Sequence, residues 1–492
     1  MGPRRVVVVG GGNAGLCAAL AARERGAEVL LLERGDLDSR GGNTAFTAGA
    51  MRVAYTDVED LRRLMPDLSD DEVATTDFGS YPAEAFFADL ARVSEYRTDP
   101  DLAAVLVEQS YSTLLWMREK GVRFLPIYGR QAFKIDGRFT FWGGLTVEVS
   151  GGGPGLVAFL SSAAEREGVT IQYGARAVSL LHNDDGVSGI TVHQNGRTRE
   201  EVADAVILAC GGFQANTEWR TRYLGTSWDL AKVRGTLHNT GDGHRMALEI
   251  GASSSGNWSG CHAVAWDLNA PEFGDLSIGD QFQKHSYPFG IMVNAEGRRF
   301  VDEGADFRNY TYAKYGRRIL EQPGQFAWQI FDQKVVHLLR DEYRMRHASK
   351  VTAPTLEALA AKLEGVDSKG FLQEIAQYNA AIDGSIPFDP NVKDGRRTRG
   401  LGVEKSNWAN RLDRGPFEAY AVTCGITFTF GGLRIDSSAQ VLDTDLQPIR
   451  GLFAAGELVG GLFYFNYPGG SGLTSGSVFG RLAGHSAALR DS

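Results

Sequence analysis

Apolar and polar residues alternate in blocks at the start of the chain, and the blocks indicate strands and helices in turn. Residues 6–9 are four consecutive valines, and residues 16–22 form an apolar, alanine-rich block typical of a buried helix. A second short apolar block, 29–32, ends at Glu33. We therefore expect a strand, a helix and a second strand, the beginning of a parallel α/β sheet.

Apolar periodicity and turn signals predict further helices and strands along the rest of the chain. Helical periodicity covers residues 57–120 and 156–167, and the Asn195-Gly196 pair predicts a hairpin turn. Asp242 is placed to cap a further helix, and a last helix is expected to end near Leu489. Short strands are predicted at 169–173, 177–181, 189–193, 197–201, 205–213 and 451–457, with hairpins at 291–303 and 431–443.

The length of the chain and the change of composition along it predict two domains. The chain has 492 residues, of which 43% are hydrophobic, enough for more than one core. The stretch 259–426 differs from both ends, because it combines many aromatic residues with a long polar helical section. We interpret it as an inserted α+β domain, with 1–258 and 427–492 forming the first domain.

A glycine motif joins the first strand to the first helix. Gly10, Gly12 and Gly15 have the spacing G-x-G-x-x-G, and Glu33 follows 23 positions after the first glycine. The glycines permit a tight turn, a close approach of the backbone to a pyrophosphate, and close helix packing, while the helix N-terminus holds the phosphate charge. Glu33 can accept hydrogen bonds from both ribose hydroxyls. This context predicts dinucleotide binding rather than a simple glycine-rich turn.

Composition excludes several function classes. The formal charge of −9 and the pI near 5.6 argue against a nucleic-acid partner. We expect neither a signal peptide nor a membrane span, since the first strand begins near residue 6 and no apolar run is long enough. The four cysteines lie far apart without C-x-x-C spacing, which predicts reduced thiols, a cytoplasmic protein, and no metal, iron–sulfur or haem site.

Two later glycine-rich segments suggest where a flat ring system could lie. Residues 40–51 combine consecutive glycines with Asn43 and Thr44, which suits a backbone passing against a ring; an ordinary helix-entry loop is the alternative. Residues 466–473 lead into the last helix, and a helix N-terminus there can face the pyrimidine edge of a flavin and stabilise negative charge on the reduced ring.

Taken together, the motifs resemble the FAD-binding fumarate reductase and succinate dehydrogenase flavoprotein superfamily. They are G-G-G-N-A-G (10–15), G-G-N-T (41–44), A-C-G-G-F (209–213), N-T-G-D-G-H-R-M-A (239–247), V-N-A-E-G-R-R-F-V-D-E (293–303) and G-L-F-A-A-G-E (451–457). Residues 463–473 look most similar to tricarballylate dehydrogenases, and next to 3-ketosteroid Δ1-dehydrogenases. The resemblance implies a glutathione-reductase-like Rossmann domain for FAD, a cap domain over the flavin, and hydride transfer between a substrate carbon and flavin N5.

The resemblance also implies which residues hold the cofactor. Covalently attached members carry a histidine near the position of Arg40, so we expect non-covalent FAD. The residues expected to bind it are Gly10, Gly12, Asn13, Ala14, Gly15, Glu33, Arg34, Gly41, Gly42, Asn43, Thr44, Ala48, Gly49, Ala177, Ala209, Cys210, Gly211, Asp242, Gly456, Glu457, Gly472 and Leu473.

The catalytic residues of the family match this sequence less completely than its cofactor-binding residues do. Arg308 follows the 293–303 motif one residue later than the catalytic arginine of fumarate reductases, and it is either a proton carrier or a carboxylate-binding or salt-bridging arginine. His262 resembles a histidine that binds a substrate carboxylate, with a packed cap histidine as the alternative. Tyr310 or Tyr312 could transfer the proton instead, as a tyrosine of this region does in the ketosteroid enzymes. His285, Lys284, Tyr464 and Ser471 are expected to contact substrate.

Two departures from the fumarate reductases argue against fumarate or succinate activity. Thr427-Phe428 replaces a pair of histidines, and Tyr467 replaces an arginine. Tyr467 can donate to a carbonyl or carboxyl oxygen, helped by the backbone N–H near Ser471, and so stabilise an enolate; a core tyrosine is the alternative.

Three functions follow, in order of preference. The first is an FAD-dependent dehydrogenase that introduces a C=C bond next to a carboxyl or carbonyl group, similar to tricarballylate dehydrogenase. The second is a ketone Δ1-desaturase, which the aromatic residues Phe463, Tyr464, Phe465 and Tyr467 favour. The third is a flavin-binding electron-transfer or sensing subunit without substrate chemistry of its own. A separate electron acceptor is expected for the enzyme.

Overall fold

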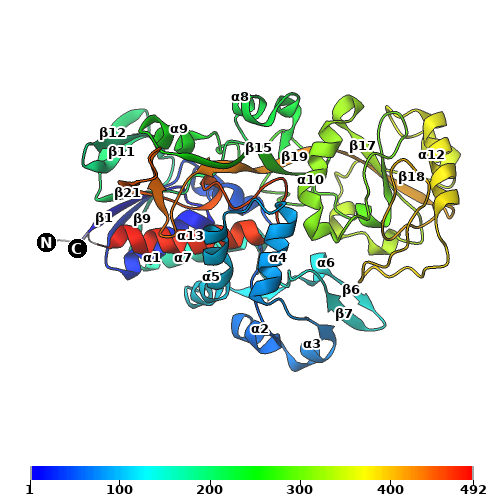
Figure 1. Ribbon diagram of the computed structural model, residues 1–492, viewed down its shortest axis with the longest axis horizontal. Helices are drawn as coiled ribbons and strands as arrows, with labels where there is room; N and C mark the ends of the chain where they lie inside the picture. Colours follow the sequence, from blue (N-terminus) through cyan, green and yellow to red (C-terminus); the bar gives the residue numbers. More distant parts are fainter. Residues whose placement is uncertain (1–2, 490–492) are drawn as a thin grey trace.

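The computed structural model describes residues 3–489, and the first and last of the described residues lie close together at one end of the elongated molecule (Figure 1). The centre of this region is a six-stranded sheet in the order β20-β21-β13-β1-β2-β9. All neighbours are parallel except β20, which is antiparallel to β21. The strands are β1 (Arg5–Val9), β2 (Glu28–Leu32), β9 (Thr170–Gln172), β13 (Ala205–Leu208), β20 (Gln440–Leu442) and β21 (Pro448–Ala454).

The first and last long helices lie side by side against this sheet (Figure 1). They are α1 (Asn13–Glu24) and α13 (Ser471–Ala488). Glycines let them approach closely, because a Cβ at Gly480 would lie 2.3 Å from the Ala14 carbonyl oxygen, and one at Gly484 would lie 2.2 Å from that of Ala18. The C-terminal helix therefore packs directly against the N-terminal helix. Two further helices of this region are α7 (Gly152–Arg166) and α9 (Asp242–Glu249).

A small antiparallel sheet, β10-β11-β12, follows the predicted strands closely. Asn195 and Gly196 connect β11 to β12 with φ angles of 49° and 73°, as a tight hairpin turn requires. Its strands are β10 (Arg176–Asn183), β11 (Gly186–Gln194) and β12 (Arg197–Val202).

The region predicted to be helical, 57–120, consists mainly of four helices. They are α2 (Val58–Leu64), α3 (Asp70–Ala74), α4 (Ala83–Val93) and α5 (Pro100–Glu119). Short elements accompany them: β3 (Ala50–Met51), β4 (Thr76–Asp77), β5 (Phe124–Pro126), α6 (Tyr128–Gln131), β6 (Ala132–Ile135), β7 (Arg138–Phe141) and β8 (Val147–Val149). Within residues 3–489, no helix has the length and apolar character needed to cross a membrane.

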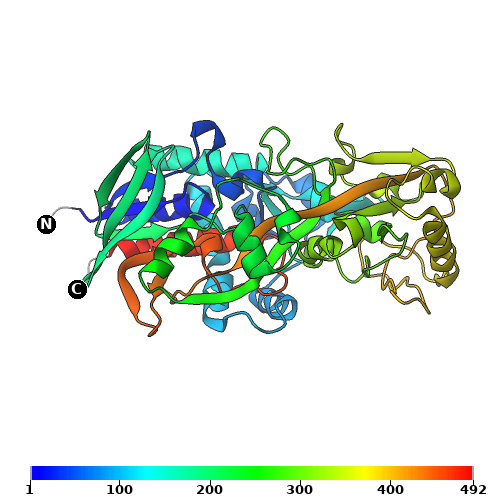
Figure 2. The same cartoon turned by 90° about the horizontal axis from the view of Figure 1, so that it is seen from above.

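One long strand runs from the first apolar core to a second apolar core at the other end of the molecule, and another long strand pairs along part of it (Figure 2). β15 (Ser254–Asp267) and β19 (Phe417–Leu433) pair antiparallel from Ser254 opposite Leu433 to Asp267 opposite Val422. The predicted domain limits, 258/259 and 426/427, fall inside these strands. The inserted region is therefore joined by a continuous two-stranded ribbon, not by loops.

The remaining elements belong to this second region or border on it. β19 also pairs with β14, β17 and β18, and β17 pairs with β16. The bounds are α8 (Thr217–Trp219), β14 (Lys232–Val233), β16 (Ile291–Val293), α10 (Tyr312–Leu320), β17 (Ala327–Phe331), β18 (Lys350–Ala353), α11 (Leu356–Ala360) and α12 (Ser368–Ala381).

Two local predictions are wrong. Gly241, with φ of 84°, is the N-cap of α9, so Asp242 is already its first residue and instead pairs with Arg34 and Arg176. The hairpin at 291–303 is reduced to a single bridge, Val293 to Arg299, because β16 pairs with β17 instead. A strand in a larger sheet satisfies more backbone groups than an isolated hairpin does.

Candidate active site

The turn from β1 into α1 has the close contacts that the glycine motif predicts. Gly10 has φ of +107°, and a Cβ at Gly15 would lie 1.9 Å from the Gly10 carbonyl oxygen. The helix begins at Asn13, whose backbone N–H donates to Thr44 Oγ1 at 3.0 Å. Only glycine at 15 lets the helix N-terminus lie this close to the strand, where its N–H groups can face a phosphate.

Glu33 is fixed at the end of β2. Its Oε2 accepts from the Gly11 N–H at 2.8 Å, and its Oε1 accepts from the Gly35 N–H at 2.6 Å. Burial raises the pKa of this carboxyl, and the two backbone donors oppose that shift. A carboxylate has about four lone-pair directions, so the group retains capacity for ribose hydroxyls.

One cavity of about 260 Å³ runs from this glycine turn to the second region of the molecule. All the residues predicted to bind the cofactor line it, except Gly15, Gly41 and Gly49. A Cβ at Gly42, with φ of +52°, would meet no described atom within 4 Å, so the backbone here borders open space. Gly15 does not line the cavity; it lets the helix pack closely against the strand. These residues fit an extended dinucleotide.

Glu457 is a second carboxyl at this cavity. Its Oε1 accepts from the Thr429 N–H at 2.9 Å, and its Oε2 accepts from the Asn239 and Gln214 side-chain amides at 3.2 and 3.3 Å. Burial raises the pKa of Glu457 to about 7, against these hydrogen bonds. The group is therefore held in place beside the space that the cofactor fills.

Arg308 lines the opposite end of the cavity. It opens a short 3₁₀ helix, Arg308–Tyr310, and is 8% exposed. Its Nη1 lies 3.3 Å from His285 Nδ1, and its Nε donates to the Arg130 carbonyl oxygen at 3.2 Å. Burial lowers the pKa of Arg308, and burial with the neighbouring Arg308 charge lowers that of His285 well below its ordinary value. His285 is thus a neutral acceptor for the guanidinium.

Two more arginines line this end, and the sequence did not reveal them. Arg234 Nε donates to Asp280 Oδ1 at 2.7 Å, and Arg130 Nη1 pairs with Asp280 Oδ2 at 3.0 Å. Gln283 donates to the same carboxylate at 2.8 Å. Because Arg130 and Arg234 share a single carboxylate and Arg308 lies nearby, this end of the cavity carries an excess of positive charge.

A ring cluster lies beside the arginines. The ring centroid of His262 is 4.9 Å from that of Tyr312, 4.8 Å from that of Tyr467 and 5.2 Å from that of Phe428. The hydroxyls of Tyr312 and Tyr467 are hydrogen-bonded to each other. Burial raises the pKa of both tyrosines and lowers that of His262 well below its ordinary value. Both ring nitrogens of the buried His262 lack a partner among the described residues.

Of the residues predicted for substrate chemistry, the cavity brings together Arg308, His262, His285 and Tyr467, but not four others. The Tyr310 hydroxyl donates to Asp89 instead, and Lys284 pairs with Asp267 at 3.4 Å and with backbone carbonyls. Ser471 donates to the Pro468 carbonyl through both its hydroxyl and its N–H, and Tyr464 lies outside the lining. None of these four presents a group to the cavity, so we assign them no contact with substrate.

The cavity residues that the sequence missed share a reason. Arg130, Arg234, Asp280 and Gln283 each lie in a segment without a glycine motif or a regular apolar pattern. Only folding brings them to one place, and arginines and aspartates at such positions are common on any surface. The sequence leaves Tyr310 and Tyr312 as alternatives for proton transfer. In the structure, the side chain of Tyr312 lines the cavity and that of Tyr310 points to Asp89.

A parallel α/β sheet with a dinucleotide cavity closed by a second region defines a flavoprotein of the two-domain oxidoreductase type. The family model described as FAD binding domain matches residues 5–473, and the chain belongs to this family. The protein binds FAD and is an FAD-dependent oxidoreductase that acts on carbon–carbon bonds.

Known relatives cover nearly the whole chain. The probable fumarate reductase Ifc3 of Shewanella frigidimarina is 31% identical over 487 residues, which are 98% of this chain and 74% of the relative. The 4-oxocyclohexanecarboxylate 2-dehydrogenase of Sinomonas cyclohexanicum is 28% identical over 582 residues, which cover 99% of this chain and 94% of the relative. The solved 3-ketosteroid Δ1-dehydrogenase of Sterolibacterium denitrificans shares the fold, with a TM-score of 0.73 at 22% identity over 98% and 99% of the two chains.

Proposed function

We propose that the protein is a dehydrogenase that desaturates a C–C bond next to a carboxyl or carbonyl group. The supporting observation is that one cavity joins the dinucleotide-binding glycine turn to an end lined by Arg308, Arg234 and Arg130. When bound, FAD supplies hydride chemistry at its N5 atom. The chain's own residues bind the substrate, orient it and move the proton.

The arginines provide the binding of a carboxylate. A guanidinium presents paired donors that match the two oxygens of a carboxylate. Among the described residues, the ion pairs of Arg234 and Arg130 both go to Asp280, so two arginines share one carboxylate and the site retains positive charge for a substrate with more than one carboxyl group, such as a tricarboxylate of the tricarballylate type. The names of the fumarate reductase relatives agree with a carboxylate substrate.

Arg308 is the proton carrier in this proposal. An ordinary arginine holds its proton at every physiological pH, and a carrier needs a site that weakens that hold. Burial lowers the pKa of Arg308, and the neutral His285 beside it accepts a hydrogen bond without adding charge. The substrate proton next to the activating carbonyl is the one transferred.

Tyr467 activates the substrate oxygen. Its raised pKa keeps the hydroxyl protonated, and Tyr312 holds that hydroxyl in place. A neutral donor at a carbonyl or carboxyl oxygen stabilises the enolate that forms as the neighbouring proton leaves.

A ketone desaturase is the second candidate, and the ring cluster favours it. Tyr467, Tyr312 and Phe428 form a partly apolar wall with hydroxyl donors, which suits a cyclic ketone. The relative named for 4-oxocyclohexanecarboxylate acts on a compound that carries both a ketone and a carboxylate. A substrate of that kind would use the tyrosines and the arginines together. The third expectation, a flavin-binding subunit without substrate chemistry, does not apply, because the protein is an FAD-dependent oxidoreductase that acts on carbon–carbon bonds.

The test is the substitution Arg308→Ala. Loss of the proton carrier should lower anaerobic flavin reduction by about 10²–10⁴-fold, the usual range for removal of an acid–base group, while FAD stays bound. The measurement is stopped-flow flavin bleaching, with the bound FAD quantified from the visible absorbance.

The matched control is Arg318→Ala, which removes an arginine 53% exposed on α10 and paired with Glu321. It should reduce flavin at the wild-type rate. Wild-type rates in Arg308→Ala with every carboxylate and ketone that reduces the native enzyme would refute the assignment.

A further inference from the structure

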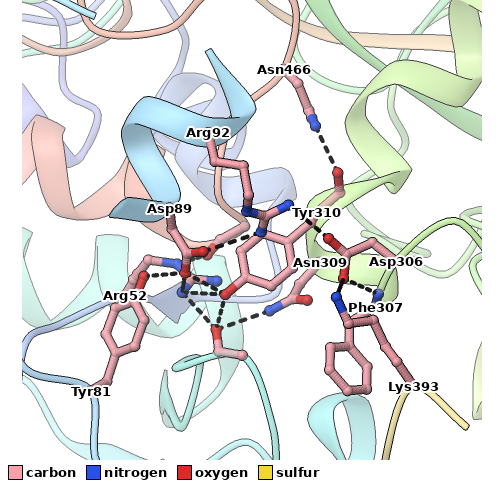
Figure 3. Close-up of polar contacts among 12 residues, drawn as sticks. Arg52, Tyr81, Asp89, Arg92, Asp306, Phe307, Asn309, Tyr310, Lys393 and Asn466 are labelled. Atoms are coloured by element: carbon pink, nitrogen blue, oxygen red, sulfur yellow. Dashed lines mark hydrogen bonds and ion pairs between the residues drawn. The ribbon is translucent and has the colours of Figure 1, made fainter. Parts of the chain in front are cut away.

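A polar cluster outside the cavity lies where α4 meets the segment that carries Arg308 (Figure 3). Its central residue is Asp89 of α4, and the segment is 306–310, called here the arginine segment. We propose that Asp89 is a positioning residue, which clamps the arginine segment through Tyr310 and Arg92 and so holds Arg308 at the charged end of the cavity. This inference rests on the proposed function for the role of Arg308.

Asp89 gathers donors from three parts of the chain. Its Oδ2 accepts from the hydroxyls of Tyr310 at 2.5 Å and Tyr81 at 2.7 Å, and its Oδ1 lies 3.1 Å from Arg92 Nη2. Figure 3 shows the side chains of Tyr310 and Tyr81 converging on this carboxylate. Burial and the nearby Asp89 raise the pKa of Tyr310 to about 12, so its hydroxyl remains a donor at neutral pH.

Arg92 forms an ion pair with Asp306, the first residue of the arginine segment. Arg92 Nη1 lies 2.7 Å from Asp306 Oδ2, and the guanidinium carbon lies 4.7 Å from the centre of the Tyr310 ring. The ion pair therefore fixes the start of the segment, and Asp89 fixes its end at Tyr310. Both contacts cross from α4 to the inserted region.

The opposite side of the segment is held by the turn before α13. The Asn466 amide donates to the Tyr310 carbonyl at 2.6 Å, and the Gly469 N–H donates to the Asn309 carbonyl at 2.9 Å. In a 3₁₀ helix with three residues per turn, side chains two positions apart point to different sides. Tyr310 can thus face Asp89 while Arg308 faces the cavity.

Arg52 connects the clamp to the cofactor end. Its side chain is fully buried and lies 3.7 Å from Asp89; its Nε donates to the Gly469 carbonyl at 2.8 Å, and its Nη1 donates to the Gly143 carbonyl at 2.6 Å. The adjacent Gly470 lines the cavity. The same charged cluster therefore fixes the arginine segment and the turn at the start of α13, which positions the two against each other.

The experiment uses holoenzyme variants Asp89→Asn and Tyr310→Phe, with Glu84→Gln as the control. Glu84 is exposed on the same helix, so this control also removes one carboxylate from α4. Asp89→Asn should lower kcat about 10–100-fold with KM for substrate changed less than about threefold, because a misplaced catalytic group costs rate rather than binding. Hydrogen exchange of amides 306–310 should accelerate about tenfold or more. Tyr310→Phe should change both in the same direction, and the double variant should add little to Asp89→Asn.

Unchanged exchange at 306–310 in both variants would overturn the clamp, and so would faster exchange with wild-type kcat. Tyr310→Phe decides alone if Asp89→Asn fails to bind FAD, since it removes only one hydroxyl. Failure of the proposed function gives a different result: Arg308→Ala would then turn over at the wild-type rate while Asp89→Asn still loosened the segment.

Discussion

At the scale of single residues, burial decides the charge of the histidines. His244 is fully buried among the rings of Phe213, Trp219 and Trp258, with centroids 5.9, 6.5 and 5.5 Å away. Burial lowers the pKa of His244 to about 4, against about 6.5 in an unfolded chain. Below pH 6.5 the unfolded state binds a proton that the folded state rejects, so the free energy of unfolding falls as pH falls.

This predicts a pH-dependent effect of His244→Phe. Between pH 7 and pH 5, His244 should lower the free energy of unfolding by about 2 kcal/mol, at about 1.4 kcal/mol per pH unit below 6.5. The variant lacks that loss, so its urea-unfolding free energy should fall by about 2 kcal/mol less than that of the wild type over this interval. Equal falls in the two proteins would show that His244 does not titrate differently on folding.

The sequence predicts the site residues that belong to a local motif, but not those that distant segments bring together. Glu33 and the glycines act within a local strand–turn–helix, so their spacing alone predicted their positions. Arg234 and Arg130 both pair with Asp280 at the cavity, across 46 and 150 positions of sequence, and only the fold brings the three residues together. Tyr310 and Tyr312 are two residues apart, and no local rule decided which hydroxyl would face the cavity.

At the scale of elements, the packing of α1 on β1 determines whether the cofactor can bind. The Gly15→Ala substitution places a methyl group 1.9 Å from the Gly10 carbonyl oxygen, which only a movement of the helix can relieve. We expect FAD affinity to fall about tenfold or more, because the helix N-terminus moves away from the phosphates. Fluorescence titration of the apoprotein with FAD measures it.

Gly384→Ala is the matched control, because a Cβ at Gly384 has no described atom within 4 Å. It should bind FAD as the wild type does. Equal affinities in Gly15→Ala and Gly384→Ala would contradict the packing argument.

Elements also explain the errors in the predicted boundaries. Periodicity identified the strands of the sheet but not β15 and β19. β19 continues from the first apolar core into the second without a turn signal, and β15 pairs along part of it. The change of composition at 259 and 427 indicates that a second core is present, but it does not indicate where a strand ends.

At the scale of the whole molecule, one cavity links segments from almost every part of the chain. Residues before 60 and after 450 line much of the end at the glycine turn, and residues between 230 and 312 line most of the charged end. The ribbon of β15 and β19 joins the two regions, and the Asp89 cluster fastens α4 to the segment that bears Arg308. The proposed function therefore requires hydride chemistry and carboxylate or carbonyl binding to take place in this one cavity.

The decisive measurement is anaerobic flavin bleaching across polycarboxylates, cyclic ketones and keto acids. We expect at least one compound bearing a carboxylate or ketone to bleach the flavin of the wild-type holoprotein rapidly, and we expect Arg308→Ala to slow this reaction by about 10²-fold or more. If none of these compounds bleached the flavin, the proposed function would be wrong.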